Sequence, residues 1–283
     1  MSDSTASVFV SIASGPSGAT LFGQTTVNAN GGVAAFGDLA LDRGGSYTLK
    51  TQSPGLTTVV SGSFSIAAGA PATLAWRVQP SNVNAGSPIT PAVEVEVRDV
   101  HGNRAPATVA VTMSIESGPS NSTLSGTRTV NSSNGVAVFS NLALDRVGNY
   151  SLRASAGSLT HTISNTFTVA SGSPSKIVFT VQPSNTTAGQ VISPSVSIAL
   201  LDSFDNVALV NNRSVTLSIN SGPPGSTLGG TTTVNTTAGT ASYPTIFLNT
   251  AGTYTLLASG TNLTSAVSTS FSIAPASPNR LAF

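Results

Sequence analysis

The chain of 283 residues contains no cysteine, only two histidines and one tryptophan, and charged residues make up just 7% of it. The absence of cysteine excludes a disulfide framework and any cysteine-ligated metal site. Eleven Lys and Arg residues are matched by ten carboxylates, which excludes the concentrated basic surface that nucleic-acid binding requires. No run of about 20 apolar residues occurs, so the sequence predicts no membrane-spanning segment.

Hydroxyl and amide side chains take the place of charge. Ser, Thr and Asn together account for 101 of the 283 residues, and apolar residues for 39%. This apolar content is too high for a disordered chain. The first residues, Met1 to Thr5, show neither the cationic nor the apolar region of a signal peptide. The composition is that of a folded protein and is more common in secreted surface proteins than in cytoplasmic ones.

The sequence repeats itself with a period of about 103 residues. The segment SIASGPSGATL, which starts at Ser11, recurs as SIESGPSNSTL from Ser114 and as SINSGPPGSTL from Ser218. This period is much longer than the roughly 20 to 50 residues of a solenoid or propeller repeat. It is long enough for a domain with its own core. We therefore expect a tandem array of separate domains.

The repeat boundaries divide the chain into two complete and two partial units. The expected units are a partial repeat over residues 1–70, complete repeats over 71–173 and 174–275, and the start of a further repeat over 276–283. The chain thus reads as a fragment truncated at both ends. The first unit has no counterpart of Thr73 to Arg104, so we expect it to lack its first two strands. It should be less stable than the others, with an uncovered sheet edge that can pair with another chain.

Each unit has the pattern of a β-sandwich. The segment Val93 to Arg98 alternates apolar and polar residues, as do residues 8–12, 109–115 and 215–219. This period of two is typical of half-buried strands. Gly, Pro, Asn and Ser interrupt the pattern about every ten residues, which indicates about seven short strands in each unit.

Two local motifs have a clear physical reason. Asp99 and Gly102 occupy the first and fourth positions of an expected type I turn. Asp205 replaces the glycine in the third unit, where Asp can adopt the left-handed conformation. A glycine lies two residues before a tyrosine in all three units, which predicts a tyrosine corner; the tyrosines are Tyr47, Tyr150 and Tyr254.

The segments that join the units are short and contain proline. Pro71, Pro174 and Pro278 lie among small residues at the three expected junctions. Proline fixes its own backbone and restricts the residue before it. We therefore expect an extended, semi-rigid array.

At these residues the sequence resembles the bacterial Ig-like repeats of the invasin and intimin group. The resemblance covers nearly the whole chain and is carried by the Asp-x-x-Gly-Asn turn, the Gly-Val-Ala-x-Phe segments at 32–36 and 135–139, and the Gly-x-Tyr-x-Leu segments. The third unit departs from it at Asp205 and at Thr240 to Tyr243. The resemblance implies tandem Ig-like sandwiches on a surface or secreted protein, where most units act as spacers and binding usually belongs to a specialised terminal domain.

The candidates for catalysis are few. His101 corresponds to Phe204 in the next unit, and His161 to Thr58 and Ser265. Neither histidine has a neighbouring Asp or a nucleophile elbow, so both are expected to be exposed turn or strand residues. Glu94 and Glu96 share one strand face, where paired carboxylates could serve glycoside hydrolysis. The third unit has Ser and Ala at these positions, and a solvated pair is the expected alternative.

Two further features could bind ligands. Calcium could be held by the turn residues Asp99, Asn103, Asp202, Asp205 and Asn206. Each cluster offers only two or three side chains where calcium requires six to eight oxygens, so turn capping is the favoured interpretation. Trp76 could stack on a sugar, but its counterparts Phe179 and Phe283 favour a core or junction aromatic.

The sequence thus predicts an all-β array of tandem Ig-like sandwiches without catalytic residues or a cofactor. The expected function is a non-enzymatic spacer or stalk segment of an extracellular or cell-surface, adhesin-like bacterial protein. Its expected partners are neighbouring repeats, with a host protein or carbohydrate reached through another domain. Two alternatives stay open, a carbohydrate- or protein-binding Ig-like module and an accessory region of a large secreted enzyme.

Overall fold

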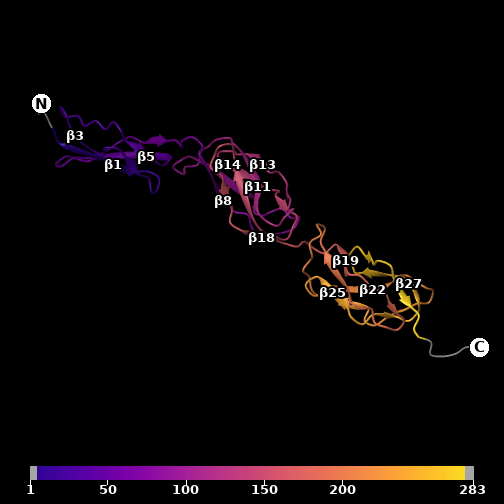
Figure 1. Ribbon diagram of the computed structural model, residues 1–283. Helices are drawn as coiled ribbons and strands as arrows, with labels where there is room; N and C mark the ends of the chain where they lie inside the picture. Colours follow the sequence, from indigo (N-terminus) through magenta and orange to yellow (C-terminus); the bar gives the residue numbers. More distant parts are fainter. Residues whose placement is uncertain (1–4, 278–283) are drawn as a thin grey trace, which may run out of the picture.

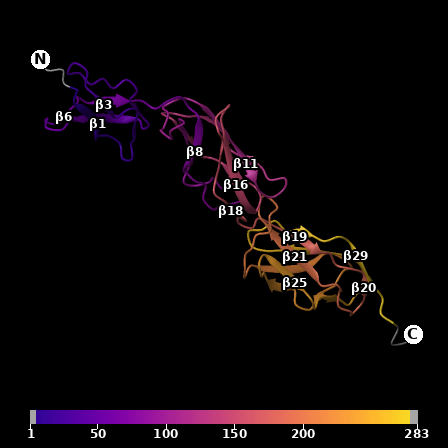
Figure 2. The same cartoon turned by 60° about the vertical axis from the view of Figure 1, so that its left-hand side comes forward.

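A computed structural model describes residues 5–277. Three units follow one another in a row, and the two ends of the chain lie at opposite ends of that row (Figures 1 and 2). All regular secondary structure in the described residues is β, which confirms the predicted fold class. Accordingly, no helix long and apolar enough to cross a membrane is found between residues 5 and 277.

The middle unit is a sandwich of two facing sheets. Its strands are β8 (Thr73–Val78), β9 (Val83–Asn84), β10 (Val93–Arg98), β11 (Ala110–Ser117), β12 (Leu124–Ser125), β13 (Thr129–Asn131), β14 (Val136–Phe139), β15 (Ala143–Leu144), β16 (Gly148–Ser155), β17 (Thr162–Ile163) and β18 (Phe167–Ala170). One sheet has the order β14-β10-β8, and the other has the order β13-β11-β16-β18-β9, with β17 on β16. Seven of these strands have three or more residues, which matches the predicted number. The others are strands of two residues each at the margins of the sheets.

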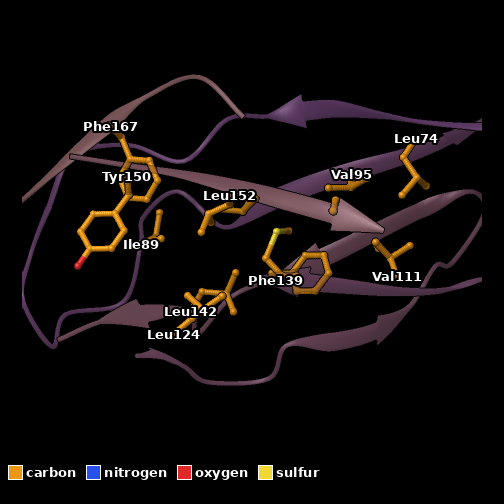
Figure 3. Packing of buried hydrophobic residues seen from close by; sticks show 14 of the residues in the cluster. Leu74, Ile89, Val95, Val111, Leu124, Phe139, Leu142, Tyr150, Leu152 and Phe167 are labelled. Atoms are coloured by element: carbon orange, nitrogen blue, oxygen red, sulfur yellow. The ribbon is translucent and has the colours of Figure 1, made fainter. Parts of the chain in front are cut away.

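Alternation along the strands builds the core of this unit. Val93, Val95 and Val97 on β10 are fully buried, whereas Glu94 and Glu96 between them are only partly buried. Figure 3 shows Leu74 and Val95 from one sheet pointing toward Val111 and Leu152 from the other. The predicted period of two is therefore confirmed, and each strand contributes one side of itself to the sandwich interior.

The last unit repeats this architecture. Its strands are β19 (Lys176–Val181), β20 (Thr186–Thr187), β21 (Val196–Leu201), β22 (Ser214–Ser221), β23 (Leu228–Gly229), β24 (Thr233–Asn235), β25 (Thr240–Tyr243), β26 (Phe247–Leu248), β27 (Gly252–Ser259), β28 (Ala266–Val267) and β29 (Phe271–Ala274). The sheet β19-β21-β25 faces the sheet β20-β29-β27-β22-β24, which also carries β28. A second buried cluster, from Ile177 to Ile273, fills the space between the sheets.

The first unit has only one of the two sheets. Its strands are β1 (Ser7–Ser14), β2 (Leu21–Phe22), β3 (Thr26–Asn28), β4 (Ala40–Leu41), β5 (Gly45–Gln52), β6 (Val59–Val60) and β7 (Phe64–Ile66). The main sheet has the order β3-β1-β5-β6, with β7 also on β5. Nothing in residues 5–70 corresponds to the facing sheet β14-β10-β8. Val10, Ala29 and Tyr47 are the buried apolar residues of this part of the chain.

The loss is larger than the two strands that the sequence predicted. Residues 33–36 have the same Gly-Val-Ala-x-Phe pattern as β14, yet they form no strand. In the middle unit β14 pairs with β10, with Val95 opposite Ala137 and Val93 opposite Phe139. The first unit has no strand equivalent to β10. Residues 33–36, the counterpart of β14, therefore have no partner and do not form a strand.

The predicted turns and tyrosine corners are present. The hydroxyls of Tyr47, Tyr150 and Tyr254 each donate a hydrogen bond to the carbonyl oxygen four residues upstream, at 2.7, 2.8 and 2.7 Å respectively. Gly102 has a φ of 81° and its substitute Asp205 a φ of 66°. Aspartate therefore adopts the left-handed conformation that the turn requires, as predicted.

Candidate functional site at the unit junctions

The turn after strand β10 is organised by the buried carboxylate of Asp99. This side chain is 2% exposed. Its Oδ1 accepts hydrogen bonds from the backbone N–H groups of His101 and Asn103, both at 2.9 Å. Its Oδ2 accepts from the N–H of Gly69 at 2.8 Å and from Nδ2 of Asn103 at 2.9 Å. Gly69 belongs to the linker, so a single carboxylate fixes the turn and the connection to the preceding unit together.

Asn103 extends this network into the preceding unit. Its Nδ2 donates a hydrogen bond to the carbonyl oxygen of Asp42 at 2.8 Å. Its Oδ1 accepts one from the N–H of Gly44 at 3.0 Å. The side-chain amide thus offers one donor and one acceptor to two backbone groups, as a neighbouring strand would. The contact joins residues about 60 positions apart, on different units.

The second junction uses the same geometry. The carboxylate of Asp202, which is 1% exposed, accepts hydrogen bonds from the N–H groups of Phe204, Asn206 and the linker residue Gly172. Nδ2 of Asn206 donates to the carbonyl oxygen of Asp145 at 2.8 Å. The N–H of Val147 donates to Oδ1 of Asn206 at 3.1 Å. The same connection therefore occurs twice with equivalent residues.

The charge of these two carboxylates is stabilised by the donors around them. Burial acts to raise the pKa of Asp99, but hydrogen bonds from the Asn103 side chain and from the backbone of Gly69, Asn103 and His101 lower it to about 2. The pKa of Asp202 is also lowered: burial opposes the shift, and the side chain of Asn206 with three backbone N–H groups outweighs it. Both groups are therefore ionised at neutral pH.

An aromatic contact distinguishes the second junction from the first. The ring of Phe204 lies directly on Gly86 of the middle unit; a Cβ at Gly86 would be 2.0 Å from Cε2 of that ring. The counterpart of Phe204 in the first junction is His101, which is exposed. The first unit has no segment equivalent to residues 71–104, and so it has no glycine surface for His101 to contact.

The five turn residues considered for calcium have different roles in the structure. Asp99, Asn103, Asp202 and Asn206 direct their oxygens at N–H donors of the turn, the linker and the preceding unit. Asp205 is exposed and forms an ion pair with Lys176. Between residues 5 and 277 no group of three or more His, Cys, Asp or Glu side chains is positioned to hold a metal ion.

The other candidate residues are not brought together. Glu94 pairs with Arg77 at 2.9 Å, and Glu96 with Arg98 at 2.8 Å, on the outer face of the sandwich. His101 and His161 are both exposed and lie in different parts of the unit. Trp76 packs against the core of the middle unit, as expected, but its Nε1 is buried without a hydrogen-bond partner.

A groove runs beside the linker at each junction, and the two grooves differ in chemistry. At the second junction the groove has a volume of about 490 Å³, and its lining includes Val147, Val169, Leu209 and Val210. Leu209 is 67% exposed. At the first junction the equivalent groove has a mixed lining, in which Asn103, Arg104 and Asn134 lie beside Ile66 and Pro106. The sequence interpretation did not identify this difference, because it depends on which residues the junction brings together.

The sequence interpretation also did not identify the loop of the preceding unit that each junction asparagine contacts. These loops follow strands β4 and β15, and they read Asp42-Arg43-Gly44 and Asp145-Arg146-Val147. The contact uses only backbone groups of the loops, so side-chain chemistry gave no signal for them. The available sequence signal was that this loop recurs at the same spacing from the Asp-x-x-x-Asn turn.

No family model matches this sequence, and no curated protein matches it. Several solved structures are similar to it. The Escherichia coli adhesin FdeC is 16% identical, with 95% of this chain and 85% of that chain covered and a TM-score of 0.42. The D00-D0 domain of intimin is 13% identical, with 71% and 98% covered and a TM-score of 0.38.

A β-glycosidase from Bacteroides vulgatus is also similar, at 12% identity, with 72% of this chain but only 25% of that chain covered and a TM-score of 0.28. The fold assignment itself rests on the sheet topology described above, and we argue the function from the contacts of the chain.

Proposed function

We propose that this chain is a non-enzymatic spacer, a semi-rigid segment of an extracellular or cell-surface, adhesin-like bacterial protein. The observation that carries the proposal is the asparagine contact between units, which occurs at both junctions with the same donors and acceptors. A chain of freely moving domains has no need for an equivalent contact at each joint. A spacer that projects another domain at a set distance does.

The mechanism is mechanical. The carboxylate of Asp99 or Asp202 holds its turn and the linker glycine in one cluster. The following asparagine then reaches two backbone groups of the preceding unit. Rotation of one unit against the next requires these hydrogen bonds to break. Because the aspartates are buried and the short asparagine side chains are partly buried, each joint has one preferred geometry, and the length of the array follows from the number of units.

Calcium is not required in this mechanism. In many-domain arrays a metal ion could stiffen the junctions, but here the relevant oxygens already accept hydrogen bonds from N–H groups. We expect the same small-angle X-ray scattering profile for the full chain in calcium and in a chelator. Extension of the chain only in calcium would contradict this proposal and would assign the Asp turns to metal-controlled junctions.

The variants Asn103→Ala and Asn206→Ala test the spacer directly. Each removes both hydrogen bonds between two units and leaves the strands intact. We expect a broader distribution of inter-unit angles, seen as a shorter mean dimension in small-angle scattering and faster independent tumbling in NMR relaxation. Asn220→Ala, on an exposed strand position of the last unit, is the matched control. Unchanged rigidity in both junction variants would refute the mechanism.

A second candidate function is binding at the second junction. It is favoured by one observation, the more apolar groove at this junction, where valines and Leu209 take the place of the arginine and asparagines found at the first. The groove contains no aromatic ring on which a sugar could stack, so a protein ligand fits it better than a carbohydrate. Leu209→Ser should then abolish binding to a protein partner while the scattering profile stays unchanged. If both binding and rigidity survive this change, the groove has no binding role.

Catalysis is not part of the proposed function. Glu94 and Glu96 are paired with arginines on an outer sheet face, and the two histidines are exposed and lie in different parts of the middle unit. An accessory role within a larger enzyme would use the same spacer mechanism. Fusion to such a domain would then alter the reach of that domain and leave its turnover number unchanged.

A further inference from the structure

The outer face of the sheet in the first unit carries an exposed aromatic side chain, Phe9 on β1. Successive side chains of a strand alternate between its two faces, and Val10 is buried at 4% exposure, so Phe9 points away from the core. Phe9 is 43% exposed. Both complete units have threonine at this position, Thr112 and Thr216. The exposed ring is therefore a feature of this unit that the repeated fold does not require.

A hollow of about 490 Å³ lies beside this ring. The register of the sheet places Thr26 of β3 and Gln52 of β5 on either side of Phe9. The three side chains form one row across the sheet, in which the ring lies between a hydroxyl and an amide. Ser7 and Pro54 also line the hollow. An apolar platform flanked by hydrogen-bonding groups is thus open to solvent.

The hollow does not depend on how many sheets the unit has. The last unit has both sheets, and it has a hollow of about 410 Å³ at the equivalent place. That hollow is lined by Ser214, Thr216, Ser259, Gly260 and Thr261, the counterparts of residues 7, 9 and 52–54. The outer face is therefore open in a complete sandwich as well, and the side chains distinguish the two hollows.

The hydroxyl groups of this row bond to one another in the complete units. Oγ1 of Thr112 and Oγ1 of Thr129 share a hydrogen bond at 3.0 Å, and the same bond forms in the last unit at 2.9 Å. Phe9 cannot make this bond, so the hydroxyl of Thr26, the counterpart of Thr129, has no such partner. Gln52 replaces a serine of the complete units, and its amide offers both donors and an acceptor. The row has gained hydrogen-bonding capacity that a ligand can use.

A cation lies one row further along the same face. Lys50 is two residues before Gln52 on β5, so its side chain emerges about 7 Å away on the same side of the sheet. At the equivalent position in the middle unit, Arg153 bonds both carboxylate oxygens of Glu116, at 2.6 and 3.0 Å. The first unit has Ala13 in place of that glutamate. No carboxylate between residues 5 and 277 forms an ion pair with Lys50, which leaves its charge available to an anion.

We propose that Phe9, Thr26, Gln52 and Lys50 form a binding site for an acidic sugar, a pyranose that carries a carboxylate. The C–H groups on one face of the sugar pack on the ring of Phe9. The sugar hydroxyls bond to the amide of Gln52 and the hydroxyl of Thr26, and the carboxylate pairs with Lys50. The site has the usual composition of a small-ligand site, an apolar surface with a few polar groups that fix the orientation. The charge-assisted bond supplies the preference for an acid.

A protein ligand fits this face less well than a sugar. Strand β1 lies between β3 and β5, so its backbone groups are already paired and cannot bind an added strand. The four side chains cover much less than the roughly 800 Å² that each partner contributes to a standard protein interface. The spacer mechanism uses none of these residues, so the sugar site and the spacer role can fail independently.

The site can be tested by NMR titration of the full chain with tetragalacturonate, a chain of four carboxylated pyranoses. We expect shifts of the amides of residues 7–11, 26 and 50–54 and of no equivalent residues in the other units. The methyl ester of the same tetramer has the same rings without the charge, and it should bind at least about threefold more weakly. Equal binding of the acid and its ester would overturn the proposal.

A second pair of probes distinguishes the two common kinds of acidic sugar. Sialyllactose carries a sialic acid, and lactose is its neutral counterpart. Binding of tetragalacturonate alone assigns the site to uronic acids, whereas binding of sialyllactose in preference to lactose assigns it to sialic acids. Either result supports an acidic-sugar site. Shifts at these amides with neither acid would be absent only if the proposal is wrong.

Variants of the chain identify the residues that bind. Phe9→Thr introduces the residue of both complete units, so the sheet should stay folded, and it should weaken binding at least about tenfold through loss of the stacking surface. Lys50→Met should remove the preference for the acid over its ester. Phe22→Ser is the matched control, since Phe22 is 51% exposed elsewhere in the same unit and its counterpart is Ser125. Undiminished binding to Phe9→Thr, or an equal loss with Phe22→Ser, would refute the site.

Discussion

The first and middle units share their motifs but differ in the number of sheets that those motifs can form. Both contain the tyrosine corner, an antiparallel pair of long strands (β1 with β5 or β11 with β16), and a Gly-Val-Ala-x-Phe segment. The middle unit has a continuous buried cluster, whereas the first retains Val10, Ala29 and Tyr47 as its buried apolar residues among residues 5–70. The first unit, whose sheet has no facing layer, therefore keeps its local strand and turn geometry but has no continuous core.

The comparison separates features that depend on sequence neighbours from features that depend on distant partners. The hydroxyl of Tyr47 reaches a carbonyl four residues away and stays buried in the first unit. Residues 33–36 need a partner strand and do not form a strand without one. Mutations at equivalent positions should therefore change the stability of the two units equally where the feature depends on sequence neighbours. They should change it unequally where the feature depends on a distant partner.

The largest difference is expected for the core phenylalanine. Phe139→Ala should lower the free energy of unfolding of the middle unit by about 3 to 5 kcal/mol, because it creates a cavity at a fully buried position. Phe36→Ala, its counterpart in the first unit, should cost about 1 kcal/mol or less, since the side chain is already half-exposed. Native-state hydrogen exchange reports the stability of each unit separately. Equal costs would mean that the first unit has a closed core in solution.

Acid should affect the middle unit more than the first. The pKa of Asp99 is lowered to about 2 in the folded protein from its ordinary value of 3.8. A lowered pKa contributes stability above the ordinary value, and this contribution is lost as the pH falls from about 4 toward 2. We expect a loss on the order of 2 kcal/mol in the middle unit, with no equivalent in the first unit, where residues 5–70 contain no such turn. Asp99→Asn is the control, because it should remove this pH dependence.

The tyrosine corner should show no difference between the units. Tyr47→Phe, and Tyr150→Phe made in a Ser122→Ala chain, each remove one hydrogen bond to a nearby carbonyl, at 2.7 and 2.8 Å. The Ser122→Ala change is needed because the Tyr150 hydroxyl also bonds Oγ of Ser122 at 2.8 Å, whereas the first unit has Ala19 at that position. We expect a similar loss of about 1 kcal/mol in both units, measured by the exchange of the strand amides around each tyrosine. A much smaller effect at Tyr47 would show that the first unit does not hold this local structure.

The smallest effect concerns the sheet that the first unit lacks. Nε1 of Trp76 on β8 is buried without a partner, and its counterpart in the last unit is Phe179. Trp76→Phe removes an unsatisfied donor but also some packing, so we expect a change in stability within about 1 kcal/mol, toward stabilisation. Thermal unfolding of the variant measures it. A loss of several kcal/mol would mean that the indole N–H has a partner in solution, such as a bound water.

Much of the fold followed from periodicities that are local in the sequence. The alternation along Val93 to Arg98 and the turn residues at Asp99 and Gly102 each depend on residues within a few positions of one another, and the 103-residue period is the recurrence of such local motifs. These features identified the sandwich class, the strands of the complete units and the tyrosine corners. The backbone of a strand or turn responds mainly to its own side chains, so such patterns can be read directly.

The junctions and the conformation of residues 33–36 were decided by the tertiary structure. The sequence marked Asp99 and Asn103 as polar turn residues but did not indicate that Asn103 reaches the backbone of Asp42 and Gly44, because that contact depends on how two folded units meet. The fate of residues 33–36 likewise depends on a partner strand, which in the sister units lies about 40 residues earlier in the chain. Pairing between distant segments stabilises a strand only when both are present, and a single segment's sequence cannot report on its absent partner.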